Sequence, residues 1–277
     1  MLDLQVVSEA ALSMDPLPMS AVRMTALAAN PSPDFAAIVE VVRFDQALTV
    51  ALLRAANSSW SSPRRLIATV SDAVIRLGAG PVLTLALGLP LHGRLNCAIP
   101  EYGLDEGDLW RHSVAASLAA ETLMTFASVS LPKETPTAAL LHDIGKLVIS
   151  RFVEPPDQHA IDAAREIGIT RIQVEGEVLG VDHAELGALI AQVWGLPATL
   201  TDGIRFHHSP EGADTPLAFG VHLADVVAKT VGVGPDDNAD LERYSQAMGE
   251  LGLTADTFDE VCSIVSTRFA EINARYE

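Results

Sequence analysis

A histidine and an aspartate stand side by side at positions 142 and 143, inside the largely apolar stretch Thr137–Ile149. Burying an unpaired carboxylate beside an imidazole costs free energy, and a divalent metal ion satisfies both groups at once. In a second interpretation, Asp143 caps the following helix and His142 is a hydrogen-bonded core residue. An isolated His-Asp pair favours that second interpretation, because such dipeptides are frequent by chance. The rest of the chain must decide between the two.

Further histidines and an aspartate lie among apolar neighbours in the second half of the chain. With the first histidine they form the set His112, His142, His183, His207, His208 and Asp225. Imidazole nitrogens and carboxylate oxygens are ligands of first-row transition metals. Two ions that share a bridging aspartate need a ligand set of this size, and such a pair can activate water and hold a phosphoryl group. The sequence therefore predicts a site for one or two divalent ions of Fe, Mn, Zn, Co or Ni.

Three other polar residues in this region carry weaker predictions. His222 precedes Asp225 by one helical turn, and we expect it to be partly exposed rather than a ligand. We expect Glu175 and Glu177 to be exposed acids on a helix. The alternative for these two is a hydrogen bond to a ligand histidine.

The elements that must position these residues are predicted to be helices throughout. Apolar residues recur at helical spacing, Gly and Pro mark the ends, and almost nothing alternates as a strand would. In the first half we expect short helices at 3–13, from 20, from 34, and at 46–57 and 69–77, with Asp45 and Gly78 as caps. In the second half we expect helices at 106–126, 136–142, 146–152, 157–168, 172–179, 182–194, 197–208, 216–231, 239–249 and 255–275. The predicted fold class is all-α.

The distribution of charge predicts how the chain is divided. The net charge is −18; residues 1–95 carry seven basic and seven acidic side chains, whereas residues 96–277 carry eleven and twenty-nine. Together with the turn-rich segment His92–Gly107, this predicts an N-terminal helical subdomain at 1–95. A core at 96–235 would hold the metal site, and acidic helices at 236–277 would pack on it. The simpler interpretation is that acidic C-terminal helices serve solubility.

Composition also excludes several classes of protein. A nucleic-acid partner is not expected, because phosphate neutralisation needs a surface rich in Lys and Arg, and the helices between 45 and 77 have no basic face. The chain has no apolar run of membrane-spanning length and no signal peptide. Cys97 and Cys262 are far apart and form no metal-ligand pair. We therefore expect a globular cytoplasmic protein.

The order of these pieces resembles the HD superfamily and, within it, the HDOD branch of bacterial signalling proteins, over about residues 10–230. The motifs of the first half are Leu17-Pro18, Phe44–Leu48 (FDQAL), Leu53–Ser58 (LRAANS) and Val70–Gly78 (VSDAVIRLG). Those of the second half are Trp110–Ser113 (WRHS), Leu140–Lys146 (LLHDIGK), Asp182–Gly187 (DHAELG), Trp194–Pro197 (WGLP), His207-His208 and Leu223–Asp225 (LAD). The resemblance implies an N-terminal helical subdomain packed on an HD-type helical core.

The resemblance also implies a role for each predicted site residue. The metal-ligand positions of the dinuclear HD phosphodiesterases fall on His112, His142, Asp143, His183, His207, His208 and Asp225. Asp143 takes the bridging position, and Lys146, one turn later, is placed to hold a phosphate. Many HDOD proteins have lost several of these ligands and act as binding or regulatory modules, whereas this chain keeps them.

Two functions follow from the resemblance. The first is a signalling or regulatory module that binds protein partners or a phosphorylated ligand and retains the metal site. The alternative is an active metal-dependent phosphohydrolase or phosphodiesterase acting on a nucleotide or another phosphoester, with Asp143 and Lys146 as catalytic residues. Cyclic di-GMP is not expected as a substrate, because the Gly-Tyr-Pro motif of that branch is missing after His208, where the chain reads Ser209–Asp214 (SPEGAD). An open pocket that reaches the ligands would favour the enzyme.

Overall fold

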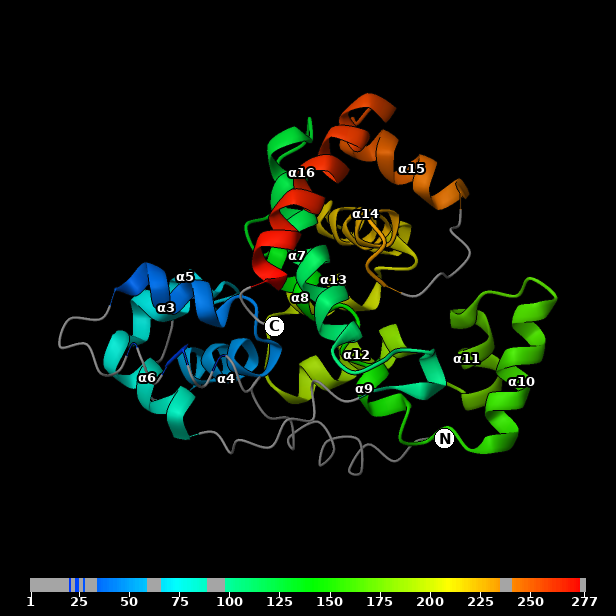
Figure 1. Cartoon of the computed structure of the whole chain (residues 1–277), viewed down its shortest axis with the longest axis horizontal. Helices are drawn as coiled ribbons and strands as arrows, with labels where there is room; N and C mark the ends of the chain where they lie inside the picture. Colours follow the sequence, from blue (N-terminus) through cyan, green and yellow to red (C-terminus); the bar gives the residue numbers. More distant parts are fainter. Residues whose placement is uncertain are drawn as a thin grey trace.

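Figure 1 shows a computed structural model of the chain. It describes residues 34–58, 66–88, 98–234 and 241–274, together with Ser20, Arg23, Met24 and Leu27. The helix predicted at 3–13, the Leu17-Pro18 motif and Cys97 lie outside the described residues. Within these residues the regular elements are helices, and the β-structure is one isolated bridge between Ile99 and Leu104. The all-α prediction is therefore confirmed.

The described helices of the first half are α3 (Phe35–Val42), α4 (Gln46–Asn57), α5 (Val70–Leu77) and α6 (Ala79–Gly88). The predicted caps are confirmed. The Asp45 carboxylate accepts the Leu48 N–H at 3.0 Å, and Gly78 ends α5 with a φ of 80°. Helix α6 was not predicted, because it is apolar on every side and carries Gly and Pro in its first turn, where Pro is tolerated.

The second half begins with the 3-10 helix η1 (Pro100–Tyr102) and the long helix α7 (Asp108–Phe126). It continues with α8 (Thr135–Leu141), α9 (Lys146–Ile149), α10 (Pro155–Glu166), α11 (Arg171–Leu179), α12 (His183–Val193), α13 (Ala198–Arg205), η2 (Pro210–Gly212), α14 (Leu217–Thr230), α15 (Leu241–Leu251) and α16 (Ala255–Asn273). The helix predicted at 197–208 is wrong at its C-terminal end. His207 donates from Nδ1 to the Ile204 carbonyl at 2.7 Å, a side-chain bond that competes with the helical ladder, and His207 and His208 lie in a turn.

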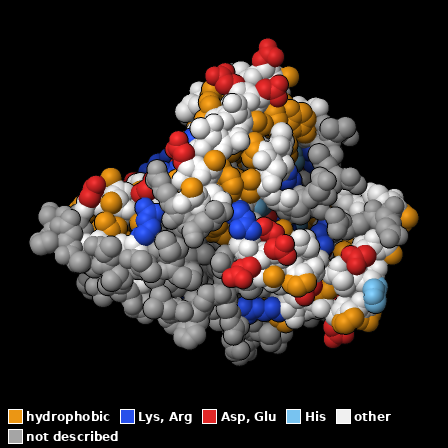
Figure 2. Space-filling model, viewed as in Figure 1, with side chains coloured by type: hydrophobic (Ala, Val, Ile, Leu, Met, Phe, Trp, Pro, Cys, Tyr) orange, Lys and Arg blue, Asp and Glu red, His pale blue; other side chains and the backbone are white. Residues whose placement is uncertain are grey.

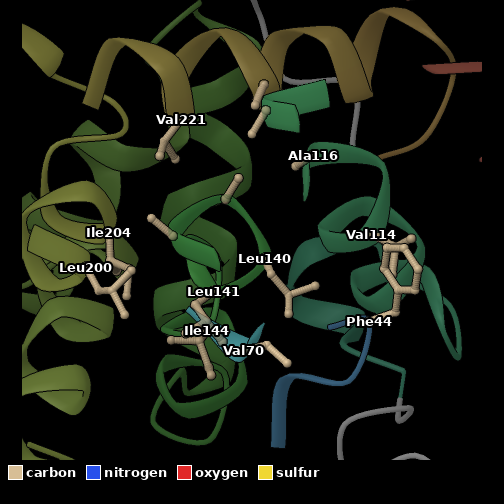
Figure 3. Packing of buried hydrophobic residues seen from close by; sticks show 14 of the residues in the cluster. Phe44, Val70, Val114, Ala116, Leu140, Leu141, Ile144, Leu200, Ile204 and Val221 are labelled. Carbon is tan, nitrogen blue, oxygen red and sulfur yellow. The ribbon is translucent and has the colours of Figure 1, made fainter. Parts of the chain in front are cut away.

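Helix α7 is the centre of the fold. It packs against α8, α14 and α16, and α15 packs against α14. Thirteen of its residues are buried, among them Ala115, Ala116, Ala119 and Ala120, whose small side chains let neighbouring helices approach closely. The hydrophobic core is continuous from Phe44 in the first half through Leu140 to Val221 in the second (Figure 3).

The helices α3 to α6 lie together on one side of the molecule, and α15 and α16 lie at another end (Figure 1). Acidic side chains gather at the end formed by α15 and α16 (Figure 2). None of the described helices is both long enough and apolar enough to cross a membrane. The division into domains at 95 and 235 remains a prediction.

The first half is attached to the second by buried polar contacts as well as by the core. Gln46 Nε2 donates to Ser113 Oγ at 3.0 Å and to the Leu140 carbonyl at 2.9 Å. Trp110 Nε1 donates to the Phe44 carbonyl at 2.8 Å. These contacts end on α7 and α8, the two elements that carry or precede the predicted ligands His112 and His142.

Candidate metal centre

The His142-Asp143 pair lies in the turn between α8 and α9. His142 Nδ1 donates to the Ala139 carbonyl at 2.7 Å, so its ring is tied to the last turn of α8. Gly145 brings this turn against the start of α12, where a Cβ atom at position 145 would lie 1.9 Å from the His183 carbonyl oxygen. The close approach places Asp143 beside His183, although the two are forty residues apart in sequence.

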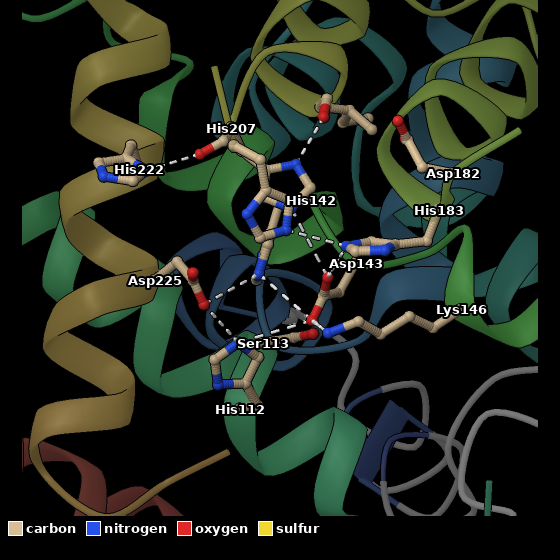
Figure 4. Close-up of polar contacts among 12 residues, drawn as sticks. His112, Ser113, His142, Asp143, Lys146, Asp182, His183, His207, His222 and Asp225 are labelled. Atoms are coloured by element: carbon tan, nitrogen blue, oxygen red, sulfur yellow. Dashed lines mark hydrogen bonds and ion pairs between the residues drawn. The ribbon is translucent and has the colours of Figure 1, made fainter. Parts of the chain in front are cut away.

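The structure brings all seven predicted ligands to one place (Figure 4 draws six of them with labels). His112 comes from α7, His183 from the first turn of α12, Asp225 from α14, and the pair His207-His208 from the turn after α13. These elements meet because α7 packs on α8 and α14, and α12 packs on α9 and α13.

Four ligand atoms form a first group. His112 Nε2 lies 2.9 Å from Asp225 Oδ1 and 3.6 Å from Asp143 Oδ2. His142 Nε2 lies 3.4 Å from Asp143 Oδ2 and 3.6 Å from Asp225 Oδ1. Ligands bonded at about 2.1 Å to one ion are separated by roughly 3.0–3.4 Å, depending on whether the geometry is octahedral or tetrahedral. The group therefore fits around a single ion, and we call it the first position.

The other oxygen of Asp143 faces a second group. Asp143 Oδ1 lies 3.4 Å from His183 Nε2 and 3.7 Å from His207 Nε2. His183 Nε2 and His208 Nε2 are 3.0 Å apart, and the ligand atoms of the three histidines lie within 4.8 Å of one another. We call this group the second position. Asp143 directs one oxygen to each position, which is the geometry of a bridging carboxylate.

Several of these atoms are buried without a hydrogen-bond partner. They are Nε2 of His112, His142 and His207, and Oδ1 of Asp143 and Asp225. Each buried polar atom left unsatisfied costs about 1–3 kcal/mol. Five of them converge on one space, where a divalent cation would satisfy the nitrogen and carboxylate lone pairs together. The residues present therefore fit a metal.

Hydrogen bonds on the far side of the rings select the metal-binding tautomer. Nδ1 of His112 lies 2.8 Å from the Val233 carbonyl, and Nδ1 of His142 and His207 are likewise bonded to carbonyls. A carbonyl oxygen only accepts, so Nδ1 carries the proton of the neutral ring and Nε2 carries the lone pair. The 2.9 Å contact of His112 Nε2 with Asp225 Oδ1 then joins two lone pairs, which a cation would stabilise.

Two lysines complete the electrostatics. Lys146 Nζ donates to Asp143 Oδ2 at 2.6 Å, and Lys229 Nζ donates to Asp225 Oδ2 at 2.9 Å. Burial raises the pKa of Asp143, but His142 and Lys146 outweigh it and hold that pKa well below its usual range. Burial also raises the pKa of Asp225, and Lys229 outweighs it in the same way. Both carboxylates are therefore ionised, as metal binding requires.

The histidines differ in their protonation. Burial lowers the pKa of His207 and His208 well below the usual value, so both rings are neutral near pH 7. Burial also lowers the pKa of His142, but Asp143 and Asp225 outweigh it and raise that pKa. A metal ion would therefore have to displace a proton from His142 at pH values below this raised pKa, and metal affinity would rise with pH in that range.

Two expectations about neighbouring residues were wrong. His222 is buried, with 6% of its surface exposed, and its Nδ1 donates to the His207 carbonyl at 2.8 Å, so it supports the ligand turn. Glu175 is fully buried and accepts from His183, whereas Glu177 is exposed as expected. The signal for Glu175 was its i,i+4 spacing from Arg171, with which it pairs.

The site is enclosed. The side chains of the ligands other than His208 are 0–5% exposed, and His208 is partly exposed. A cavity of about 120 Å³ lies elsewhere, between α3 and α5 on one side and α7 and α8 on the other, lined by Arg43, Glu121 and Lys133 among others. We predicted that an open pocket reaching the ligands would favour an enzyme. This cavity does not reach them, so it gives that function no support.

Comparison with solved structures supports the fold. The MmoQ response regulator fragment of Methylococcus capsulatus (strain Bath) is 26% identical, with a TM-score of 0.64 over 89% of this chain and 94% of that one. A virulence factor of Campylobacter jejuni is 16% identical, with a TM-score of 0.72 over 96% and 100%. An HDOD domain protein of unknown function from Geobacter sulfurreducens is 22% identical, with a TM-score of 0.51 over 99% and 96%.

Comparison of sequences identifies the family. An uncharacterized protein of Treponema pallidum (strain Nichols) is 26% identical over 181 residues, which are 65% of this chain and 34% of that protein. The chain thus spans about a third of the length of this curated relative. A family model for the HDOD domain matches residues 14–210, which is more than half of the chain. The matched part includes six of the seven predicted ligands, all except Asp225. The chain belongs to the HDOD domain family.

Proposed function

We propose that this chain is a signalling module whose buried centre holds one or two divalent ions of Fe, Mn, Zn, Co or Ni. It acts by binding a protein partner or a phosphorylated ligand. The observation that carries the proposal is the convergence of five unsatisfied buried ligand atoms, with the two oxygens of Asp143 facing two separate groups. One of the similar solved structures is named a response regulator, which supports a role in signalling.

Enclosure of the ligands favours regulation over turnover. A substrate must reach the ions directly. A regulatory ion needs only a chain of contacts that links its site to a surface where a partner binds. Gln46 offers such a route, because it bonds to Ser113, next to the ligand His112, and to Leu140, two residues before His142. Binding of an ion at the first position would therefore change the contacts of Gln46 and, through them, the position of the helices of the first half.

A phosphohydrolase is the competing function, and the position of Lys146 favours it. Its ammonium group is held 2.6 Å from Asp143 Oδ2, the oxygen that faces the first position, where its positive charge would attract a phosphate. Divalent ions held by this ligand set would supply positive charge that lowers the pKa of water and polarises a phosphoryl group. His208 is the one of the seven candidate ligands that is partly exposed, so this function requires a substrate path on its side of the site.

Metal content per chain tests the proposal. Protein purified without a histidine tag or added metal is analysed for its elements, beside Asp143→Ala and the exposed control Asp214→Ala. We expect up to two ions in the wild type and in the control, and their loss from Asp143→Ala. Absence of stoichiometric metal, even after reconstitution with Mn, Fe or Zn, would overturn it.

The loaded protein then separates the two functions. A screen of nucleotides and cyclic dinucleotides should show no metal-dependent hydrolysis if the chain is a regulatory module. Turnover that disappears in Asp143→Ala, while the far-UV circular dichroism is unchanged, would establish the phosphohydrolase instead.

A further inference from the structure

The two metal positions differ in the groups that accept a hydrogen bond from Nδ1 of their histidines. At the first position, Nδ1 of His112 and Nδ1 of His142 are bonded to backbone carbonyls. At the second position, Nδ1 of His183 lies 2.7 Å from Oε2 of Glu175. A carboxylate behind an imidazole fixes the ring and raises its basicity as a ligand, and a charged acceptor does so more strongly than a neutral carbonyl. His183 is therefore the better supported ligand.

Glu175 is itself held on all sides. Its Oε2 also accepts the backbone N–H of His183 at 2.9 Å, so both the ring and the backbone of this ligand are tied to one carboxylate. Its Oε1 accepts from Tyr102 Oη at 2.8 Å and from Arg171 Nε at 3.1 Å. These four bonds use the acceptor sites of a carboxylate, which leaves the fully buried side chain with no freedom to turn.

Tyr102 and Arg171, which both bond to Glu175, also contact each other. The Arg171 guanidinium stacks on the Tyr102 ring at 3.7 Å from its centroid, and both side chains are buried. Tyr102 belongs to the turn closed by the Ile99–Leu104 bridge, and Arg171 is the first residue of α11. Segments far apart in the sequence thus converge behind a single ligand of the second position.

The ligand sets show why the second position depends on this support. The first position has oxygens from two carboxylates, Asp143 and Asp225. The second has one carboxylate oxygen, from Asp143, and three imidazoles. Three of its four ligands are therefore neutral, and the carboxylate bonded to His183 Nδ1 strengthens one of these three as a ligand.

We propose that Glu175 is a positioning residue that determines occupancy of the second metal position, and that Tyr102 and Arg171 hold it in place. The inference rests on the proposed metal centre. It makes the two positions unequal: loss of Glu175 weakens binding at the second and spares the first.

Glu175→Gln is the test, because it keeps the shape of the side chain and removes its charge. Each position is isolated first. His208→Ala damages the second position and leaves the first, whereas His112→Ala damages the first and leaves the second. Metal-free proteins are titrated with Co²⁺, followed by visible absorption and calorimetry. We expect Glu175→Gln to weaken Co²⁺ binding about 10–100-fold in the His112→Ala background and to change nothing in the His208→Ala background.

Two further variants control the experiment. Glu177→Gln removes an exposed charge from the same helix and should leave both affinities unchanged. Tyr102→Phe keeps the ring that stacks on Arg171 and removes one hydrogen bond to Glu175, so it should weaken the second position by less than Glu175→Gln does. If circular dichroism shows that Glu175→Gln does not fold, the Co²⁺ affinity of Tyr102→Phe tests the inference instead.

The outcomes are distinguishable. Wild-type protein that takes up no Co²⁺ would refute the metal centre itself. Wild-type protein that binds two ions, with equal affinities in Glu175→Gln, would refute the role of Glu175 alone. Equal weakening of both positions would show a general structural effect and would likewise overturn the inference.

Discussion

Gly145→Ala is expected to empty the second metal position and leave the first filled. An ideal Cβ atom at residue 145 would lie 1.9 Å from the carbonyl oxygen of His183, 2.8 Å from its carbonyl carbon and 2.9 Å from the Gly187 nitrogen. The backbone of Gly145 is right-handed helical, with φ of −61° and ψ of −29°, a conformation that alanine adopts readily. The whole effect of the substitution is therefore steric.

The size of the effect follows from these contacts. Ordinary van der Waals contact begins at 3.4 Å, so the start of α12 and the turn at 145 must separate by about 1.5 Å. The three atoms are backbone atoms, and no rotation of a side chain relieves the overlap. Metal–ligand distances tolerate about 0.2 Å, so a shift of this size takes His183 Nε2 out of bonding range. Overpacking of this kind also destabilises a protein by about 1–3 kcal/mol.

The assay counts ions per chain by native mass spectrometry after reconstitution with Mn²⁺, and follows unfolding by calorimetry. We expect one ion in Gly145→Ala against two in the wild type, with a fall in Tm of about 2–4 °C for each kcal/mol lost. Gly249→Ala is the matched control, because a Cβ there meets nothing within 4 Å in α15, and it should keep both ions. Two ions and a wild-type Tm in Gly145→Ala would refute the close approach on which this reasoning depends.

Three more predictions concern other parts of the chain. Gln46→Leu removes donors from two buried acceptors on α7 and α8, and should lower the free energy of unfolding in urea by about 1–3 kcal/mol; an unchanged midpoint would contradict it. Gly234→Ala should weaken metal binding at the first position only, because residue 234 has a φ of 132° and its Cβ would lie 2.4 Å from His112 Nδ1; equal loss at both positions would argue against this. Burial and then a neighbouring aspartate raise the pKa of the Cys262 thiol to about 11, so less thiolate is present at pH 8 than for an ordinary cysteine. In a Cys97→Ser background its alkylation by iodoacetamide should rise about tenfold per pH unit up to pH 10, and a plateau near pH 9 would disprove the raised pKa.

Local chemistry in the sequence determined the helices and the ligand types. Asp45 and Gly78 act on backbone groups a few residues away, so their caps could be predicted without a tertiary structure. The His142-Asp143 pair stood out because an ionisable pair between apolar runs needs a partner. Apolar neighbours singled out the further candidates His112, His183, His207, His208 and Asp225. The family resemblance assigned them metal-ligand positions, and the structure brings all seven residues together.

Only the tertiary structure decided how the predicted ligands divide between the two proposed positions and which residues support them. The burial of Glu175 depends on Tyr102, 73 residues away, and the link from Gln46 to the carbonyl of Leu140 spans 94 residues. Helical periodicity reports which residues share a face, but it does not report which other segment covers that face. His222 and Glu175 were misjudged for this reason. The cost of burying each is offset by hydrogen bonds to residues outside its own helix, from His222 to the His207 carbonyl and from Tyr102 and His183 to Glu175. The spacing of Glu175 from Arg171 is visible in the sequence, but these contacts are made only in the folded chain.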